Sequence, residues 1–160
     1  MTDVGFAVLD TPIGPMSVTT DDAGVRRVRF AAAAAPGIPD PLVADAVAQL
    51  RAYFDGSAAG FTVPVVIGGG SEFDRAVWAE LARIPYGEMR TYGQVAAAVG
   101  DASAARAVGV ACNRNPVPII VPCHRVVGAG GKLVGFGGGL PRKRHLLELE
   151  ARVAFERNWI

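Results

Sequence analysis

Three consecutive glycines at positions 68–70, followed by Ser71, divide the 160-residue chain into two parts of different character. A run of glycines disfavours helix and strand alike and is typical of a flexible joint. Residues 1–70 carry 4 arginines and 7 aspartates, a net charge of −3, whereas residues 71–160 carry 12 basic and 8 acidic residues, a net charge of +4. We therefore predict two small domains, residues 1–70 and residues 71–160.

The composition is that of a packed globular protein. Hydrophobic residues make up 51% of the chain, and 20 glycines and 11 prolines favour many turns. No stretch of eighteen uninterrupted apolar residues is present, and the N-terminus lacks a basic segment followed by an apolar core. We therefore predict neither a membrane span nor a secretory signal, and we expect a cytoplasmic protein.

Cysteine and histidine are rare in this chain, with two residues of each. Two cysteines cannot build a disulfide framework, and the spacing of Cys112 and Cys123 matches no familiar zinc pattern. Reduced thiols in a cytosolic protein are the simpler interpretation. We expect no metal and no cofactor.

The first part of the chain is predicted to be a small α/β scaffold domain. Apolar residues recur at helical spacing over residues 41–54, which predicts an amphipathic helix. Short apolar runs separated by turn residues predict strands at residues 6–9, 16–20, 25–30 and 61–67. This part holds no cysteine, no histidine and no glycine-rich phosphate loop, so nothing in it indicates catalysis.

The second part is predicted to be mostly helical. One helix is expected to begin at Ser71 and to end before Pro85. Thr91 is a predicted cap for a short helix over residues 92–99, and another helix is expected over residues 103–112. Two short helices joined by a tight turn with glycine form a helix-turn-helix pattern.

The second helix of this pair is slim. Arg106 is its one long central side chain, and the other residues leave the backbone nearly bare: Ala104, Ala105, Ala107, Gly109 and Ala111. Such a helix could approach DNA closely, even in the minor groove, which is too narrow for a bulkier helix. It could equally pack against another helix inside a core, and this segment alone favours neither alternative.

The chain holds one candidate nucleophile with a titratable neighbour. Cys123 and His124 stand side by side at the end of the apolar run of residues 117–121, which we expect to be a strand. A free thiol is mostly protonated at neutral pH and needs a base or a nearby positive charge to become a nucleophilic thiolate. His124 could supply the base and Arg125 the positive charge. Consecutive side chains of a strand point to opposite faces, so His124 can serve Cys123 only through a turn or a water.

A histidine base works best when a carboxylate orients it. Glu148 and Glu150 on a predicted C-terminal helix are candidates, but they face different directions and the spacing does not decide between them. The loop of residues 135–139, Gly-Phe-Gly-Gly-Gly, either frames a pocket for a planar group or is a plain turn. It lacks the Gly-Lys-Ser/Thr ending of a nucleotide P-loop, which excludes that motif.

The segment of residues 115–127, Asn-Pro-Val-Pro-Ile-Ile-Val-Pro-Cys-His-Arg-Val-Val, resembles the active-site signature of the O6-alkylguanine-DNA alkyltransferases, also called methylated-DNA–protein-cysteine methyltransferases. The similarity covers essentially residues 72–150, through residues 84–88, 91–93, 104–109, 137–140 and 146–150. It implies an α+β fold, in which a small ribonuclease H-like α/β domain precedes a mostly helical domain with a helix-turn-helix.

The resemblance implies a single-turnover DNA repair protein. It would bind duplex DNA containing O6-alkylguanine through the minor groove and flip the damaged base into a pocket. Cys123 would take the alkyl group irreversibly from O6-alkylguanine, and less well from O4-alkylthymine. The product is a thioether that no evident group cleaves, so each molecule would act once. We expect a monomer that can assemble cooperatively on DNA, with no membrane association.

The resemblance also implies roles for individual residues. His124 would act as a base through a water with Glu150 behind it, Asn115 would brace a turn, Tyr92 would press on the target phosphate and donate a hydrogen bond to the base, and Arg106 would fill the hole left by the flipped base. Further DNA contacts are expected at Thr91, Ser103, Ala104, Ala105, Gly109, Arg114 and Arg125. The substrate pocket is expected at Val126, Phe136, Gly137 and Gly138.

Two features of the chain depart from the family pattern. Some members carry zinc in the N-terminal domain through Cys and His, and residues 1–70 contain neither, so we predict no zinc. Gly137 offers no side-chain hydroxyl to the alkylated oxygen. Cys112 is expected in the core, and the tail of residues 151–160 is expected to pack on the body.

Two other functions compete with alkyl transfer. A non-enzymatic lesion-binding protein on the same fold would lack the reactive cysteine, so the presence of Cys123 argues against it. An unrelated helix-turn-helix regulator with a redox-sensing thiol would read the major groove. The slim second helix offers almost no side chains for that purpose.

Overall fold

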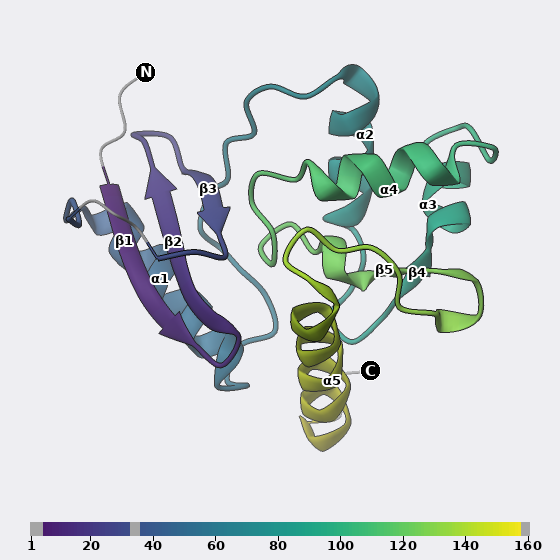
Figure 1. Ribbon diagram of the computed structural model, residues 1–160. Coiled ribbons are helices and arrows are strands. Elements are labelled where there is room, and N and C mark those ends of the chain that lie inside the picture. Colours follow the sequence, from purple (N-terminus) through teal and green to yellow (C-terminus); the bar gives the residue numbers. More distant parts are fainter. Residues whose placement is uncertain (1–4, 33–35, 158–160) are drawn as a thin grey trace. The chain divides into compact units, whose positions relative to one another are not determined.

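The computed structural model describes residues 5–32 and 36–157 of the chain. Its contacts divide it into two compact units, of which the first ends at Gly68 and the second begins at Gly69. The first unit combines an antiparallel sheet with a helix, and the second unit is mostly helical (Figure 1). The predicted α+β class is therefore confirmed.

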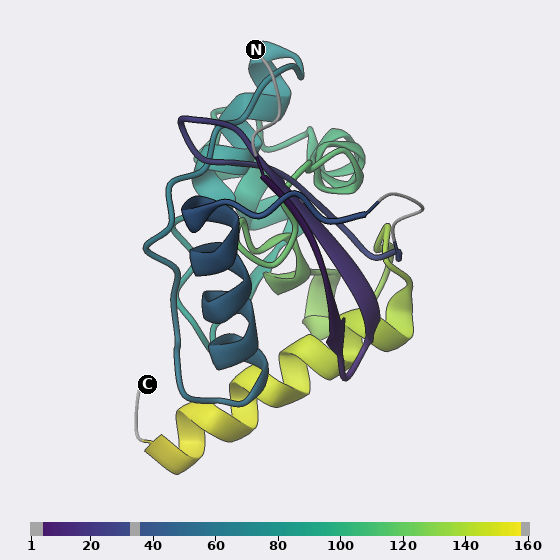
Figure 2. The same cartoon turned by 90° about the vertical axis from the view of Figure 1, so that its left-hand side faces the viewer.

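The first unit is a sheet of strands β1 (Gly5–Thr11), β2 (Gly14–Thr20) and β3 (Val25–Arg29) in that order, with helix α1 (Pro41–Phe54) packed against it (Figure 2). Both strand pairs are antiparallel. Apolar residues of the sheet and of one stripe of α1 form the buried core: Leu9, Met16, Val18, Val25, Val28, Val43, Ala46, Leu50 and Tyr53.

Helix α1 has the predicted bounds because its ends carry strong local signals. Asp40 caps the helix, since its carboxylate accepts a hydrogen bond from Leu42 N at 3.0 Å. Pro41 occupies the first turn, where a backbone N–H has no helical partner. Beyond the other end, Gly56 has a φ of 82°, a left-handed conformation that favours glycine and stops the helix.

The strand predicted over residues 61–67 is wrong. In the described part of the chain this segment pairs with β3 through a single bridge between Val25 and Val65. Pro64 has no N–H to give to a ladder. The side chain of Gln49 from α1 takes the two N–H groups before Pro64, which donate to its Oε1 at 2.8 and 3.2 Å. The Gln49 side chain therefore satisfies two backbone N–H groups that would otherwise need a neighbouring strand.

The second unit contains helices α2 (Glu72–Leu81), α3 (Tyr92–Ala98), α4 (Ala105–Asn113) and α5 (Leu140–Arg157), short strands β4 (Arg90–Thr91) and β5 (Val126–Val127), and 3-10 turns η1 (Cys123–Arg125) and η2 (Ala129–Gly131). Helices α2, α3 and α4 pack against one another, and η1 contacts α2 and α5. Strands β4 and β5 pair in parallel, which the sequence patterns did not predict. This pairing joins the segment after η1 to the start of α3.

Helices α3 and α4 form the predicted helix-turn-helix pair. The Oγ1 atom of Thr91 accepts a hydrogen bond from Gln94 N at 3.0 Å, and Gln94 Oε1 accepts one from Thr91 N at 2.8 Å, so α3 begins with a reciprocal capping box. Helix α4 begins at Ala105, later than predicted. Ser103 does not cap it, because its hydroxyl bonds to Asp101 at 2.6 Å.

The apolar run of residues 117–121 is a turn and not the expected strand. Val121 N donates to Val117 O at 2.9 Å, and Ile119 has a φ of 73°, which costs a β-branched residue about 1–3 kcal/mol. Asn115 braces this turn: its Nδ2 donates to Val121 O at 2.8 Å, and its Oδ1 accepts from Val117 N at 2.9 Å. A side-chain amide thus takes the place of strand pairing.

Helix α5 extends the chain past the region that resembles the family. Val153 and Ala154 are buried in it, as expected for a tail packed on the body, whereas Phe155 is exposed. Trp159 lies outside the described residues. None of the helices in residues 5–32 and 36–157 has both the length and the apolar character needed to cross a membrane.

Candidate active site

Cys123 lies on the 3-10 turn η1, where the backbone turns as His124 would require in order to serve it. Pro122 precedes the turn, and its carbonyl accepts a hydrogen bond from Arg125 N at 3.1 Å. A 3-10 turn has about three residues per turn, so the side chains of Cys123, His124 and Arg125 leave in three directions. Cys123 is 5% exposed, so a base stacked in a duplex has no direct access to its sulfur.

Glu150 of α5 is the carboxylate that contacts His124. The two side chains are fully buried, and His124 Nε2 lies 2.6 Å from Glu150 Oε2. Gly87 N also donates to Glu150 Oε1 at 3.2 Å. Glu148, the other candidate on this helix, is exposed. Sequence spacing did not decide which of the two glutamates orients His124, and in the folded chain Glu150 is buried against it whereas Glu148 faces outward.

Burial and charge together set the protonation of this pair. Burial acts to raise the pKa of Glu150, but His124 and Arg125 outweigh it and lower that pKa to about 2. Burial lowers the pKa of His124, the charges of Arg125 and Lys143 act in the same direction, and Glu150 opposes them. Near neutral pH the site therefore holds a carboxylate beside a neutral imidazole.

The thiol of Cys123 is protonated in the resting protein. Burial raises its pKa, and a hydrogen bond from Asn115 and the charge of Lys143 act against that rise. Cys112, in the last turn of α4, is also buried, and burial raises its pKa to about 12. A buried thiol of this kind needs a base before it can act as a nucleophile.

Lys143 is a residue of this site that the sequence analysis missed. It has no exposed surface, and its Nζ donates to Tyr92 Oη at 3.3 Å and to the carbonyls of Val134 and Gly135 at 3.1 and 3.2 Å. Burial lowers the pKa of its ammonium group. The sequence could have indicated this residue by its spacing, because Lys143 stands seven residues before Glu150 on α5 and so projects from the same helix face.

Tyr92, at the start of α3, connects the glycine loop to α4. Its hydroxyl donates to Val134 O at 2.9 Å, and its ring lies over the ammonium of Lys143 at 5.5 Å. Burial raises the pKa of Tyr92 to about 12, so the phenol keeps its proton. A Cβ added to Gly109 would meet the Tyr92 ring at 3.7 Å. One side of the slim helix α4 therefore packs inside the unit.

Most of the residues predicted to contact DNA lie in α4, beside its two ends and at the start of α3. Arg106 and Ser103 are exposed, and Ala104, Ala105 and Gly109 are partly exposed. Arg114 follows α4 with a 62% exposed side chain, in a 3.4 Å ion pair with Asp74. Thr91 is partly exposed, and its hydroxyl is used as the cap of α3.

Arg125 does not belong with these exposed residues, contrary to the predicted DNA contact. It is 7% exposed, and its Nε and Nη2 donate to Glu150 at 2.8 and 3.1 Å. Its Nη1 donates to Ile84 O at 2.6 Å. All three guanidinium nitrogens therefore donate to groups inside the protein.

The residues predicted to line the substrate pocket are distributed unevenly. Val126 is fully buried in β5, Phe136 and Gly138 are partly exposed, and Gly137 is exposed.

Among the described residues, no group of three or more His, Cys, Asp or Glu side chains is placed to hold a metal ion.

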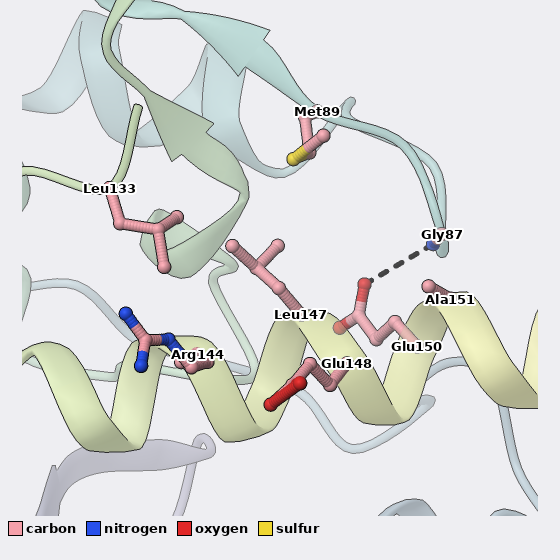
Figure 3. A pocket seen from close by; sticks show the side chains of 8 residues that line it. All are labelled: Gly87, Met89, Leu133, Arg144, Leu147, Glu148, Glu150 and Ala151. Carbon is pink, nitrogen blue, oxygen red and sulfur yellow. Dashed lines mark hydrogen bonds between the residues drawn. The ribbon is translucent and has the colours of Figure 1, made fainter. Parts of the chain in front are cut away.

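A pocket of about 340 Å³ is lined partly by residues of α5 (Figure 3). Its lining includes Glu150 but neither Cys123 nor His124, so it is not the space in which an alkyl group would meet the thiol. The lining residues are Gly87, Met89, Leu133, Arg144, Leu147, Glu148, Glu150 and Ala151.

Two family models match the chain. The one described as 6-O-methylguanine DNA methyltransferase, ribonuclease-like domain, matches residues 4–67. The one described as 6-O-methylguanine DNA methyltransferase, DNA binding domain, matches residues 72–152.

Individual relatives are similar to nearly the whole chain. A methylated-DNA--protein-cysteine methyltransferase of Methanosarcina acetivorans is 45% identical over 152 residues, which cover 91% of this chain and 97% of that protein. A protein of the same name from Mycobacterium leprae is 48% identical over 149 residues, 89% of each chain. The crystal structure of Mycobacterium tuberculosis OGT in complex with DNA has a TM-score of 0.84 at 45% identity and covers 92% of this chain and 93% of that one.

Proposed function

This chain belongs to the 6-O-methylguanine DNA methyltransferase family, and from that premise we propose that it repairs DNA by transferring the alkyl group of O6-alkylguanine to its own Cys123. The observation that carries the proposal is the buried Cys123 on the turn beside His124, whose Nε2 lies 2.6 Å from Glu150. The substrate is alkylated duplex DNA, with O6-alkylguanine preferred over O4-alkylthymine.

The reaction is an in-line displacement at the alkyl carbon. A bond forms between Cys123 Sγ and that carbon while the bond from the carbon to guanine O6 breaks. The guanine leaves as an anion that takes up a proton, and the protein keeps the alkyl group as a thioether. Donors that neutralise the developing charge on guanine lower the barrier. The Tyr92 phenol is protonated because burial raises its pKa to about 12, and it can donate to guanine by exchanging its bond to Val134 O.

His124 removes the proton that burial keeps on the thiol. Its Nε2 faces Glu150, so Nδ1 is the nitrogen that takes the proton from Cys123, through a water. The imidazolium that forms is stabilised by the carboxylate 2.6 Å away. Because burial lowers the pKa of His124, this base is neutral and available at physiological pH.

Access to Cys123 requires the target base to leave the duplex, since the sulfur is recessed. Helices α3 and α4 would bind DNA through the minor groove, where the small residues of α4 allow close approach. The exposed Arg106 would occupy the space that the flipped base vacates. Each molecule acts once, because its thioether product is stable. The protein would act as a cytoplasmic monomer that can assemble cooperatively on DNA.

Intact-mass measurement tests the proposal. After incubation with a duplex that contains O6-methylguanine, the protein should gain the mass of one methylene, at no more than one per molecule, on the peptide carrying Cys123. Cys123→Ser should bind the duplex without gaining mass, and the matched variant Cys112→Ser should still be methylated. An unmodified wild-type protein that binds the lesion would instead indicate a non-enzymatic lesion-binding protein.

A further inference from the structure

The guanidinium of Arg125 is a tightly held charged group beside His124 and Glu150, and the alkyl-transfer steps described above give it no role. It meets Glu150 with two nitrogens, Nε at 2.8 Å and Nη2 at 3.1 Å, one to each carboxylate oxygen. Its third nitrogen donates to Ile84 O at 2.6 Å, and its carbon lies 5.6 Å from the centre of the Tyr86 ring. A planar fork of this kind fixes both the position and the plane of a carboxylate.

Glu150 is held from three sides as a result. His124 meets Oε2, Arg125 bridges both oxygens, and Gly87 N donates to Oε1 at 3.2 Å. Gly87 has a φ of 80°, so the turn after Ile84 depends on glycine, and Arg125 ties the beginning of that turn through the Ile84 carbonyl. The orientation of the carboxylate toward His124 therefore depends on Arg125.

Arg125 also sets the net charge of the buried groups around His124, and that charge affects how readily His124 gains a proton. With Arg125 present, Arg125 and Glu150 neutralise each other, so a proton on His124 adds a net positive charge to a buried cluster. Without Arg125, the same proton would complete an ion pair with a buried carboxylate. In addition to Arg125, Glu150 and Lys143, both from α5, act electrostatically on His124.

We propose that Arg125 is a positioning residue for alkyl transfer, which fixes Glu150 as the anionic partner of His124 and keeps the resting imidazole neutral, ready to take the proton of Cys123. This inference rests on the proposed function. It replaces the DNA contact predicted for Arg125 with a role inside the protein.

Arg125→Met tests the inference, because methionine retains much of the apolar stem and removes the charge and the fork. Loss of a cation in direct contact with the pair should raise the protonation midpoint of His124 by about one pH unit or more. Single-turnover methyl transfer should then be slower than wild type at every pH because the fork is lost, and by about a further tenfold at a pH below both midpoints because less His124 is neutral there. Affinity for the methylated duplex should stay unchanged.

The midpoint can be measured without any substrate, by NMR titration of the histidine ring protons. The chain has only two histidines, so few ring signals need to be assigned. Arg152→Met is the matched control, because it removes the same charge from an exposed position on α5 close to Glu150. It should change neither the His124 midpoint nor the transfer rate.

Arg125→Lys separates charge from geometry and also serves if the methionine variant does not fold. Lysine keeps a positive charge but lacks the fork, so the His124 midpoint should remain near that of wild type while transfer slows at every pH. Transfer by the lysine variant at the wild-type rate would overturn the positioning role.

An unmoved His124 midpoint in Arg125→Met would also overturn the inference, and weaker DNA binding by that variant would return Arg125 to the DNA contacts. Failure of the proposed function looks different: wild-type protein would then not gain a methyl group at all, while the His124 titration would still report whether Arg125 controls the pair.

Discussion

Replacing Glu150 by Gln should destabilise the second unit strongly, in a way that depends on pH. The carboxylate is buried between His124 and Arg125, and its pKa is lowered from the ordinary value of 4.5 to about 2. A difference of about 2.5 pH units corresponds to about 3 kcal/mol of folding free energy at neutral pH. Removing one partner of a buried ion pair typically costs about 3–5 kcal/mol, which agrees with that figure.

The pH dependence follows from the direction of the pKa change. A carboxylate whose folded-state pKa is lowered contributes stability that is present above its unfolded-state pKa and is lost as the pH falls through the folded value. The difference in unfolding free energy between wild type and Glu150→Gln should therefore be constant from pH 7 to about 5. It should then shrink as the pH falls from about 4.5 towards 2, by about 1.4 kcal/mol per pH unit.

Urea unfolding followed by tryptophan fluorescence measures this difference. Trp78 is buried in α2, so it reports on the second unit, where Glu150 lies. Glu148→Gln is the matched control, because it removes the same charge from an exposed position on the same helix and should cost little. The reasoning is refuted if the two variants are equally stable at pH 7, or if the difference for Glu150→Gln does not narrow in acid.

Three further results are expected. Asn115→Ala should lower the unfolding free energy by about 2–3 kcal/mol, because it removes the brace of the turn before Cys123, whereas the exposed Asn113→Ala should cost far less; urea unfolding measures both. Lys143→Met should raise the pKa of the Cys123 thiol, because a nearby cation is lost, and so slow its alkylation by iodoacetamide near neutral pH, with the exposed Lys132→Met as control. Arg106→Ala should slow repair of duplex more than of single-stranded substrate; an equal loss on both would contradict the base-replacement role.

Local chemistry by itself determined several elements of this protein. The bounds of α1 could be predicted from the helical spacing of its apolar residues, and the starts of α2 and α3 because Ser71 and Thr91 bond to backbone three residues away. The Cys-His-Arg segment and its resemblance to an alkyltransferase signature were likewise visible in the sequence. Interactions of this range need no knowledge of the fold.

The site was decided by tertiary structure, because its contacts join residues that are distant in the chain. His124 and Glu150 are 26 residues apart, and spacing could not choose Glu150 over Glu148. The family resemblance implied Glu150, and the contact between the two side chains forms where α5 packs against η1. The same packing buried Arg125 and Lys143, although charged residues are ordinarily expected at the surface. Whether a side chain faces DNA or a buried carboxylate depends on which element covers it, and that is a property of the folded chain.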